Sequence, residues 1–369
     1  MKNILVVFGT RPEAIKMAPL VKVLLKTPEF KTKICVTAQH REMLDQVLDF
    51  FCIKPDYDLN LMKPNQTLNQ LSSRILTEID EVLKDFKPEL VLVHGDTTTS
   101  SMVALASFHR GIKIGHIEAG LRTYDKSAPF PEEINRQITG RLADLHFTPT
   151  EETAKNLLNE GVDKNSIHIT GNTVIDALFW GLKHVDETRK DIKKIKNFID
   201  FNKRLIVITG HRRENFGKKF IELCDALNQI ANRKDTQLIY PVHLNPNVQE
   251  VVYKKLSNNK NILLIPPLDY EAFIWLLNQS NFIITDSGGI QEEAPSLKKP
   301  VLVTREVTER KEAVKEGTVK LVGTDKEKIV NNAILLLENH KFYDYMANAK
   351  NPYGDGNAAG KIKNIILND

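Results

Sequence analysis

The feature that most limits the possible folds of this chain is a regular alternation of short apolar runs with longer helical patterns. The runs are rich in β-branched residues, and the alternation continues from the first residue to near the last. Continuous apolar strands separated by helices indicate parallel sheets that are covered on both faces. The sequence therefore predicts an α/β fold with strands at residues 4–8, 33–37, 90–93, 113–117, 145–147, 166–170, 205–209, 237–242, 262–265, 282–285, 301–304 and 318–322.

The number of strands and the chain length together indicate two domains. Single domains usually hold about 100–200 residues, and this chain has 369. The predicted strands are too many for one comfortable open sheet, but they divide evenly into two sets. Between the sets, residues 187–204 read ETRKDIKKIKNFIDFNKR, a charged stretch that predicts a solvated helix and linker. We therefore place the first domain at 1–186 and the second at 187–352.

The two halves begin in a similar way. In each half a glycine ends the first strand, and a basic residue and a helix follow, at 9–13 (GTRPE) and at 210–214 (GHRRE). This similarity predicts two doubly wound, Rossmann-like domains that face each other. Ligands of such folds bind outside the carboxyl ends of the strands. We therefore expect the site in a cleft between the domains.

Charge and cysteine content exclude several classes of protein. The chain has 51 Lys and Arg against 47 Asp and Glu, a net charge of +4 that is too small to indicate a nucleic-acid binder. The cysteines Cys35, Cys52 and Cys224 stand far apart, which excludes a disulfide scaffold and a thiolate zinc site and fits a reducing compartment. No apolar stretch is long enough for a signal peptide or a membrane span. We expect a soluble, cytoplasmic protein without membrane partners.

The segment that follows the first strand has two interpretations. Thr10, Pro12 and Glu13 form a helix-start pattern of N-cap, first-turn proline and capping-box acid, so helix capping alone is one interpretation. The other adds anion binding, because Arg11 and Lys16 lie beside the carboxyl end of a strand and near a helix N-terminus.

A stronger pattern occurs at residues 285–293, TDSGGIQEE. A strand ends at Thr285, and two glycines allow backbone N–H groups to approach phosphate oxygens before a helix begins. Glu292 or Glu293 is placed to accept hydrogen bonds from ribose hydroxyls, and Arg310, after the next strand, is placed to neutralise a diphosphate. A plain turn is the alternative interpretation.

Two common nucleotide motifs are missing from the sequence. The nearest approach to GxGxxG, at 354–360, has the wrong spacing and no strand before it, so NAD is not expected as a cofactor. The P-loop pattern GxxxxGK[ST] is also missing. His116 and Glu118 resemble the HxE of zinc deaminases, but the PCxxC partner is missing, so no metal is expected either.

Three acidic residues are predicted to lie at the same edge of the first sheet. Asp96 and Glu118 each come directly after a strand, and Glu132 follows a Pro-Phe-Pro turn. One such carboxylate would be a cap or a salt bridge, but three together favour general acid–base chemistry, because crowded carboxylates raise one another's pKa. His94 and His116, embedded in apolar strands, are interpreted as core residues or residues behind the site. His211, on the loop that opens the second domain, is a functional candidate.

These motifs together resemble those of the non-hydrolysing UDP-N-acetylglucosamine 2-epimerases. The resemblance runs from residue 3 to about residue 325 in the family's order. Hydrolysing relatives typically lack the Pro-Glu-Ala-Ile-Lys continuation that this chain has at 12–16. The segments that carry the resemblance are GTRPEAIKMAPL, HGDTTTS, HIEAGLRT, FPEEINRQ, TGNTVIDAL, TGHRREN, YPVHLNPNV, TDSGGIQEEAPSLKKPVLV and ERKEAVKEGTVKLVGTD.

The resemblance implies a GT-B fold, in which two Rossmann-like domains close on a nucleotide sugar. It implies interconversion of UDP-GlcNAc and UDP-ManNAc without metal or nicotinamide, and a homodimer. In such folds the chain end returns to the first domain. We therefore expect residues 353–369 to form a helix that packs there, after a stretch loosened by Gly354 and Gly356.

The resemblance also assigns residues. The acid–base candidates are Asp96, Glu118 and Glu132, and His211 lies near the diphosphate. Bacterial members carry a second UDP-GlcNAc site that activates the enzyme. The residues that match UDP contacts or their surroundings are Arg11, Lys16, Phe273, Ser287, Gly288, Gly289, Glu293 and Arg310, and those that match the activating site are Glu133, Arg212 and His243. Leu268 stands where many members carry a polar residue, which puts one uracil-side contact in doubt.

A chemical argument gives the expected mechanism. C2 of the sugar has no adjacent carbonyl, so its proton becomes acidic only when the C1–O bond to UDP breaks. Elimination then gives 2-acetamidoglucal and UDP, and re-addition with the proton delivered to the opposite face inverts C2. Three alternatives remain: a hydrolysing epimerase that releases ManNAc and UDP, a GT-B glycosyltransferase, and a nucleotide-sugar sensor without catalysis.

Overall fold

The computed structural model describes residues 1–38, 41–63, 65–210, 212 and 215–369, and these residues form two compact units. The first unit comprises 1–180 and 353–369, and the second comprises 181–352. The division lies inside one helix, α7 (Thr173–His184), earlier than the linker expected from charge. The charged segment itself holds α8 (Lys190–Lys196) and belongs to the second unit.

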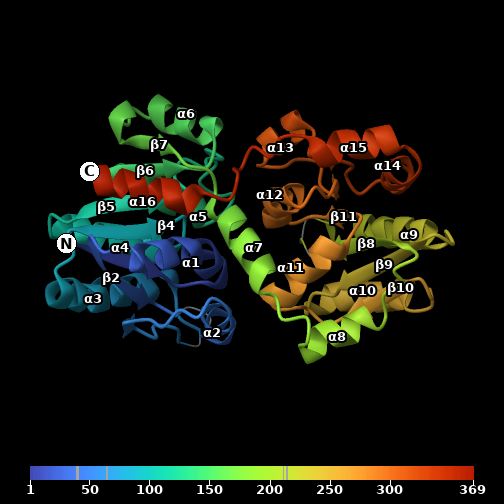
Figure 1. Cartoon of the computed structure of the whole chain (residues 1–369), viewed down its shortest axis with the longest axis horizontal. Helices are drawn as coiled ribbons and strands as arrows, with labels where there is room; N and C mark the ends of the chain where they lie inside the picture. Colours follow the sequence, from blue (N-terminus) through green and yellow to red (C-terminus); the bar gives the residue numbers. More distant parts are fainter. Residues whose placement is uncertain (39–40, 64, 211, 213–214) are drawn as a thin grey trace. The chain divides into compact units, whose positions relative to one another are not determined.

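The first unit is built on a parallel sheet in the order β3-β2-β1-β4-β5-β6-β7 (Figure 1). Its central strand buries every residue from Ile4 to Phe8, which explains why an apolar run without alternation forms it. The strands are β1 (Lys2–Phe8), β2 (Phe30–Val36), β3 (Tyr57–Asp58), β4 (Leu90–His94), β5 (Lys113–Ile117), β6 (Leu145–Thr148) and β7 (Ile167–Ile169).

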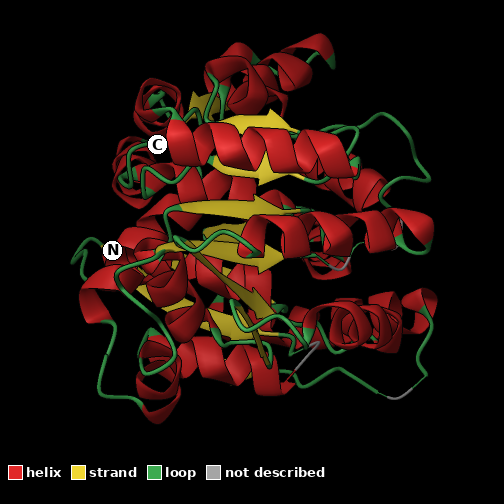
Figure 2. Cartoon of the chain, turned by 90° about the vertical axis from the view of Figure 1, so that its right-hand side faces the viewer, coloured by secondary structure: helices red, strands yellow, loops and turns green. Residues whose placement is uncertain are grey.

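Helices cover both faces of this sheet. Figure 2, coloured by secondary structure, shows helices on the outside with strands between them. One face carries α1 (Arg11–Leu25), α2 (Arg41–Phe50) and the C-terminal helix α16 (Ala358–Asn368), which packs against α1. The other face carries α3 (Leu68–Phe86), α4 (Thr98–His109) and α5 (Glu132–Leu142), packed in that order. The helix α6 (Glu151–Asn159) and a short 3₁₀ turn (Lys164–Ser166) precede β7.

The second unit repeats this plan with a parallel sheet in the order β10-β9-β8-β11-β12-β13. Its apolar core lies between the sheet and the helices α9, α10 and α14. The strands are β8 (Arg204–Thr209), β9 (Thr236–Pro241), β10 (Ile262–Ile265), β11 (Phe282–Thr285), β12 (Val301–Val303) and β13 (Val319–Leu321). The remaining helices are α9 (Lys218–Ala231), α10 (Pro246–Leu256), α11 (Tyr270–Gln279), α12 (Gly288–Ser296), α13 (Lys311–Glu316), α14 (Lys326–Glu338) and α15 (His340–Asn348).

The strand orders confirm the predicted α/β class. Counted from its own first strand, each unit has the doubly wound order 3-2-1-4-5-6, and β7 extends the first sheet by one strand. Among the strands of the described residues, the one that the sequence patterns do not reveal is β3. It has two residues, Tyr57 and Asp58, which pair with Cys35 and Val36, and so short a polar segment gives no apolar run. Within the described part of the chain, no helix is both long and apolar enough to cross a membrane.

Candidate active site

Two of the predicted carboxylates lie on neighbouring loops at the carboxyl edge of the first sheet. Asp96 follows β4 and Glu118 follows β5 directly. The Gly95 N–H donates to the Ile117 carbonyl at 2.8 Å, and His116 Nε2 bonds to the Gly95 carbonyl at 2.7 Å. Gly95, which precedes Asp96, is therefore bonded to Ile117, which precedes Glu118. These bonds hold the two loops, and with them the two acids, beside each other.

Glu118 is held in a constrained position. Its backbone has a φ of +62°, in the left-handed region that non-glycine residues seldom adopt. The Glu118 carboxylate accepts hydrogen bonds from Lys16 Nζ and, at 2.7 Å, from Asn172 Nδ2. The side chains of Lys16 and Glu118 are both largely buried. The ion pair joins the helix that follows β1 to the loop that follows β5.

A buried histidine lies behind Glu118. His94 Nε2 is 4.0 Å from a carboxylate oxygen of Glu118. Burial lowers the pKa of His94 to about 4, although the nearby Glu118 carboxylate acts in the opposite direction. His94 is therefore neutral near pH 7. This placement agrees with its interpretation as a residue behind the site.

Asp96 is oriented by a buried arginine. Arg136, on α5, donates to Asp96 Oδ2 from Nη2 and to Glu133 Oε2 from Nη1, the latter at 3.3 Å. The Glu133 side chain is fully buried, and its oxygens also accept the backbone N–H groups of Thr123 and Tyr124 at 3.0 and 3.1 Å. Burial opposes the ionisation of Glu133, but these hydrogen bonds outweigh it and lower the pKa of the carboxyl. Glu133 thus fixes the loop between β5 and α5.

The third acid, Glu132, is the first residue of α5 and is half-buried. It belongs to the same helix as Glu133 and Arg136. A carboxylate in the first helical turn is favoured by the unpaired N–H groups there. The helix that orients Asp96 therefore also carries Glu132.

The start of α1 has a capped N-terminus and also contributes a side chain to the candidate site. Thr10 is the N-cap, and it forms a capping box with Glu13. Glu13 is buried, accepts N–H groups of Gly9 and Thr10 at 3.0 and 2.8 Å, and accepts the Thr97 hydroxyl at 2.7 Å. Burial is the main reason why the pKa of Glu13 is raised. The capping interpretation is confirmed, and Lys16, one turn further on, reaches Glu118.

In the second unit, the loops after β8 and β11 are joined in a similar way. Asp286, fully buried after β11, accepts the Arg212 N–H at 2.8 Å, and the Tyr240 hydroxyl donates to the Gly210 carbonyl at 2.7 Å. Ser287 occupies the N-cap position of α12 without a side-chain capping bond. Gly288 and Gly289 form the first turn of α12, as the sequence pattern predicts.

The guanidinium of Arg310 lies over this glycine turn. A Cβ atom at Gly288 would lie 3.3 Å from Arg310 Cζ, so a side chain there would require the guanidinium to shift by a few tenths of an ångström. Arg310 Nε donates to the buried Glu292 at 2.8 Å, and Nη1 lies 3.3 Å from Glu309. Glu292 thus holds the arginine beside the glycine turn.

The remaining predicted residues of the second unit lie on separate elements. Glu293, buried on α12, accepts the Tyr270 hydroxyl of α11 at 3.3 Å, and Phe273 is half-buried one turn along α11. His243 follows β9, is exposed, and accepts the Asn245 N–H at 3.0 Å through Nδ1. His211 lies outside the described residues.

Two residues that the sequence reasoning did not single out take part in the geometry. Arg136 bonds to Asp96, and Asn172 bonds to Glu118. Both lie in segments that carry the family resemblance, FPEEINRQ and TGNTVIDAL. An arginine three residues after a glutamate, the spacing of an ion pair on one helix face, was the available signal for the first. An asparagine at a predicted helix start was the signal for the second, and it suggests only a cap.

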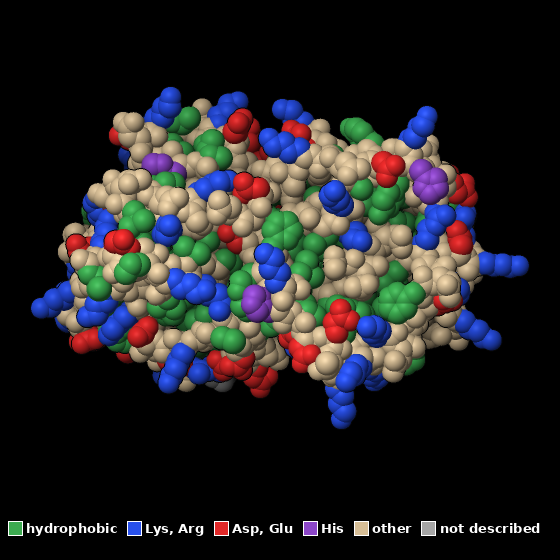
Figure 3. Space-filling model, in the orientation of Figure 1, with side chains coloured by type: hydrophobic (Ala, Val, Ile, Leu, Met, Phe, Trp, Pro, Cys, Tyr) green, Lys and Arg blue, Asp and Glu red, His purple; other side chains and the backbone are tan. Residues whose placement is uncertain are grey.

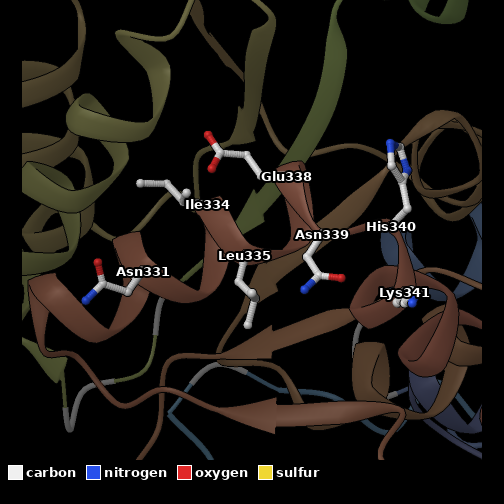
Figure 4. Close-up of a pocket in the computed structure, with 7 residues that line it drawn as sticks. All are labelled: Asn331, Ile334, Leu335, Glu338, Asn339, His340 and Lys341. Atoms are coloured by element: carbon white, nitrogen blue, oxygen red, sulfur yellow. The ribbon is translucent and has the colours of Figure 1, made fainter.

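Two pockets, of about 510 and 660 Å³, are lined by residues outside the predicted set. A pocket of about 510 Å³ lies on α14 and the start of α15 (Figure 4), and none of its lining residues, Asn331, Ile334, Leu335, Glu338, Asn339, His340 and Lys341, belongs to the predicted set. On the face drawn in Figure 3, basic and acidic side chains are interspersed.

Two doubly wound sheets, each with charged loops bonded together at its own carboxyl edge, place the protein in the Rossmann-like α/β class. The chain belongs to the UDP-N-acetylglucosamine 2-epimerase family, whose model matches residues 22–367. The UDP-N-acetylglucosamine 2-epimerases of Campylobacter jejuni and Escherichia coli K12 are each 56% identical to it. Those alignments cover 100% of this chain and 98% and 99% of the relatives.

Solved structures agree with this assignment. The UDP-GlcNAc 2-epimerase of Neisseria meningitidis, bound to UDP-GlcNAc, has 49% identity and a TM-score of 0.90, with 100% of both chains covered. The enzyme of Methanocaldococcus jannaschii in complex with UDP-GlcNAc and UDP has 34% identity and a TM-score of 0.80, also with 100% of both chains covered. These similarities extend over the whole chain and confirm the predicted family and the GT-B-like fold.

Proposed function

We propose that the protein interconverts UDP-GlcNAc and UDP-ManNAc without net hydrolysis, by elimination of UDP and its re-addition. The substrate is that of the related enzymes, two of which have been solved with UDP-GlcNAc. The non-hydrolysing route is our own step beyond the family assignment.

The contact between Lys16 and Glu118 is the observation that carries this proposal. Lys16 ends the Pro-Glu-Ala-Ile-Lys segment that hydrolysing relatives typically lack. This segment makes two contacts at the carboxyl edge of the first sheet. Glu13 binds Thr97, the N-cap of α4, and Lys16 binds the acid–base candidate Glu118. A chain that lacks this segment would lose a buried cation next to Glu118.

In the proposed reaction, a carboxylate takes the C2 proton while the C1–O bond breaks and its electron pair leaves with the UDP oxygen. A C1–C2 double bond forms, which gives 2-acetamidoglucal. In the return step the UDP oxygen attacks C1, and a second acid delivers a proton to the opposite face of C2. Asp96, Glu118 and Glu132 are the proposed acids and bases, each expected to contribute about 10²–10⁴ in rate.

The second unit is proposed to hold the departing UDP. N–H groups at the start of α12, with Ser287, suit phosphate oxygens, and Arg310 adds positive charge beside the Gly288–Gly289 turn. Arg11 and His211 complete the proposed diphosphate contacts, with Phe273 and Glu293 on the nucleoside side. Exclusion of water from the bound substrate would protect the glucal from hydrolysis.

We also propose that the protein is a homodimer and that UDP-GlcNAc activates it at a second site. Arg212 and His243 are the proposed contacts of the activator. The buried carboxylate of Glu133 binds the backbone of Thr123 and Tyr124. We therefore propose that Glu133 affects the activating site indirectly, through the loop between β5 and α5, and does not contact the activator.

One NMR experiment in D₂O tests the function. UDP-GlcNAc incubated with the protein should give UDP-ManNAc with deuterium at C2, and UDP-ManNAc should give labelled UDP-GlcNAc until both directions reach one ratio. EDTA should slow neither direction. Stoichiometric accumulation of UDP and ManNAc would indicate a hydrolase. Transfer of unlabelled sugar to an acceptor would indicate a glycosyltransferase, and recovery of unchanged, unlabelled substrate would indicate a sensor.

A further inference from the structure

Both covalent connections between the two units pass by one buried residue, Asn172. The chain leaves the first unit through α7, and Asn172 directly precedes this helix. Asn172 Oδ1 accepts the Val174 N–H at 3.0 Å, so the residue caps α7. The chain re-enters the first unit at Tyr353, whose carbonyl accepts the Asn172 N–H at 2.7 Å.

The segment around Gly171 and the segment around Tyr353 approach each other closely. Gly171 has a φ of +89°, and a Cβ atom there would lie 3.2 Å from the Tyr353 carbonyl oxygen and 3.3 Å from Gly354 Cα. Gly354 has a φ of +121°. Glycine is needed at both positions, since a side chain at either would push the segments apart. The outgoing and returning segments are thus held together beside Asn172.

Another hydrogen bond of Asn172 leads to the candidate active site. Its Nδ2 donates to Glu118 Oε2 at 2.7 Å, and the same oxygen accepts Lys16. The amide orientation is determined by its partners, because the oxygen faces an N–H donor and the nitrogen faces a carboxylate. One amide group therefore binds the start of α7 and Glu118 at the same time.

We propose that Asn172 is a positioning residue that couples the two inter-unit connections to Glu118. In this proposal, a pull on α7 or on the Tyr353 segment is transmitted by Asn172 to the carboxylate of Glu118. The inference rests on the proposed function, in which Glu118 exchanges a proton with C2.

The sharpest test is Asn172→Asp. Aspartate keeps the capping oxygen but turns a second oxygen, instead of an N–H donor, toward Glu118. We expect an unchanged KM for UDP-GlcNAc and, measured below the melting temperature, a kcat lower by about tenfold or more, as for an interaction that acts in the chemical step. The melting temperature should fall, because two buried carboxylates then face each other. Asn172→Ser, which also caps helices but cannot reach Glu118 as an amide does, should lower kcat with a normal fold as well.

A matched control separates positioning from capping. Thr67 caps α3 in the same unit through a capping box, so Thr67→Ala also removes an N-cap. Asn172→Ala and Thr67→Ala should both lower the melting temperature, but only Asn172→Ala should lower kcat. An equal loss of kcat in both variants, measured below their melting temperatures, would reduce Asn172 to a cap and overturn the proposal.

The coupling itself is tested with Gly354→Ala, which displaces the returning segment without touching Glu118. We expect a lower kcat at constant KM, and no further loss when Gly354→Ala is added to Asn172→Asp, because both changes interrupt one link. Normal kcat in a folded Asn172→Asp or Asn172→Ser variant, or additive losses in the double variant, would contradict the inference. Failure of the unmodified protein to form UDP-ManNAc would instead contradict the proposed function.

Discussion

At the scale of single residues, the acids of the first unit differ by their partners. Glu118 accepts from a lysine and an amide, whereas Asp96 accepts from an arginine that is itself held by Glu133. Charge-assisted hydrogen bonds of this kind fix the direction of a carboxylate. Glu132 stands at a helix start instead. Three acids with three different surroundings suit a reaction that needs both a base and an acid.

The first prediction concerns these acids. Asp96→Asn, Glu118→Gln and Glu132→Gln should each leave the protein folded and lower kcat by about a hundredfold or more, because an amide cannot exchange a proton as a carboxyl does. Steady-state kinetics with circular dichroism checks this. A folded variant with near-normal turnover would remove its residue from the mechanism.

The second prediction concerns Arg136. Arg136→Gln should lower kcat by about tenfold or more, because Asp96 loses its orienting donor and the buried Glu133 loses a cation. Arg141→Gln is the matched control, since Arg141 is exposed on the same helix. Equal kcat for the two variants would show that Arg136 does not orient Asp96.

At the scale of elements, three adjacent strands of the first sheet each bury a histidine. His94 ends β4, and His116 on β5 pairs in register with His146 on β6. Burial lowers the pKa to about 4 for His94 and His146 and to about 3 for His116. All three are therefore neutral in the folded protein above about pH 5.

These histidines predict acid sensitivity of the first unit. Above pH 6.5 the folded and unfolded states are both neutral at these sites. Below 6.5 the unfolded chain takes up protons first, so stability falls as pH decreases toward 4, by about 1.4 kcal/mol per pH unit for each histidine. His146→Gln should make this slope shallower by about one such increment. The measurement is urea unfolding between pH 5 and 6.5, followed by Trp180 fluorescence in a Trp275→Phe background. An unchanged slope would contradict the assignment.

The elements also show what sequence patterns reveal and what they miss. Fully buried strands such as β1 appear as apolar runs, and the capping box of α1 is visible in Thr10 and Glu13, so the α/β class and these elements were predictable. The two-residue β3 was not, because a single polar pair has no periodicity. Asp96 and Glu118 were found since strand ends share one edge. The partners Arg136 and Asn172 were not, because they reach that edge from other segments.

At the scale of the whole molecule, the chain end completes the first unit. Ile362 and Ile366 of α16 are buried, and Asp176 of α7 accepts the N–H groups of Ala358 and Ala359 at 3.1 and 2.9 Å. The Lys2 and Lys113 side chains pair with Asp369 at the other end of the helix. Residues 353–369 thus stabilise a sheet that is formed by residues much earlier in the chain.

This dependence gives the last prediction. Ile362 is fully buried on α16, so Ile362→Ala should lower the free energy of unfolding of the first unit by about 2–5 kcal/mol. Asn364→Ala, at an exposed position of the same helix, should change it by less than about 0.5 kcal/mol. The chain has two tryptophans, Trp180 in the first unit and Trp275 in the second, so variants that keep one of them report each unit separately. The Trp180 transition should shift to lower urea while the Trp275 transition stays in place. A shift in the Trp275 transition alone would mean that α16 stabilises the second unit, contrary to its packing against α1.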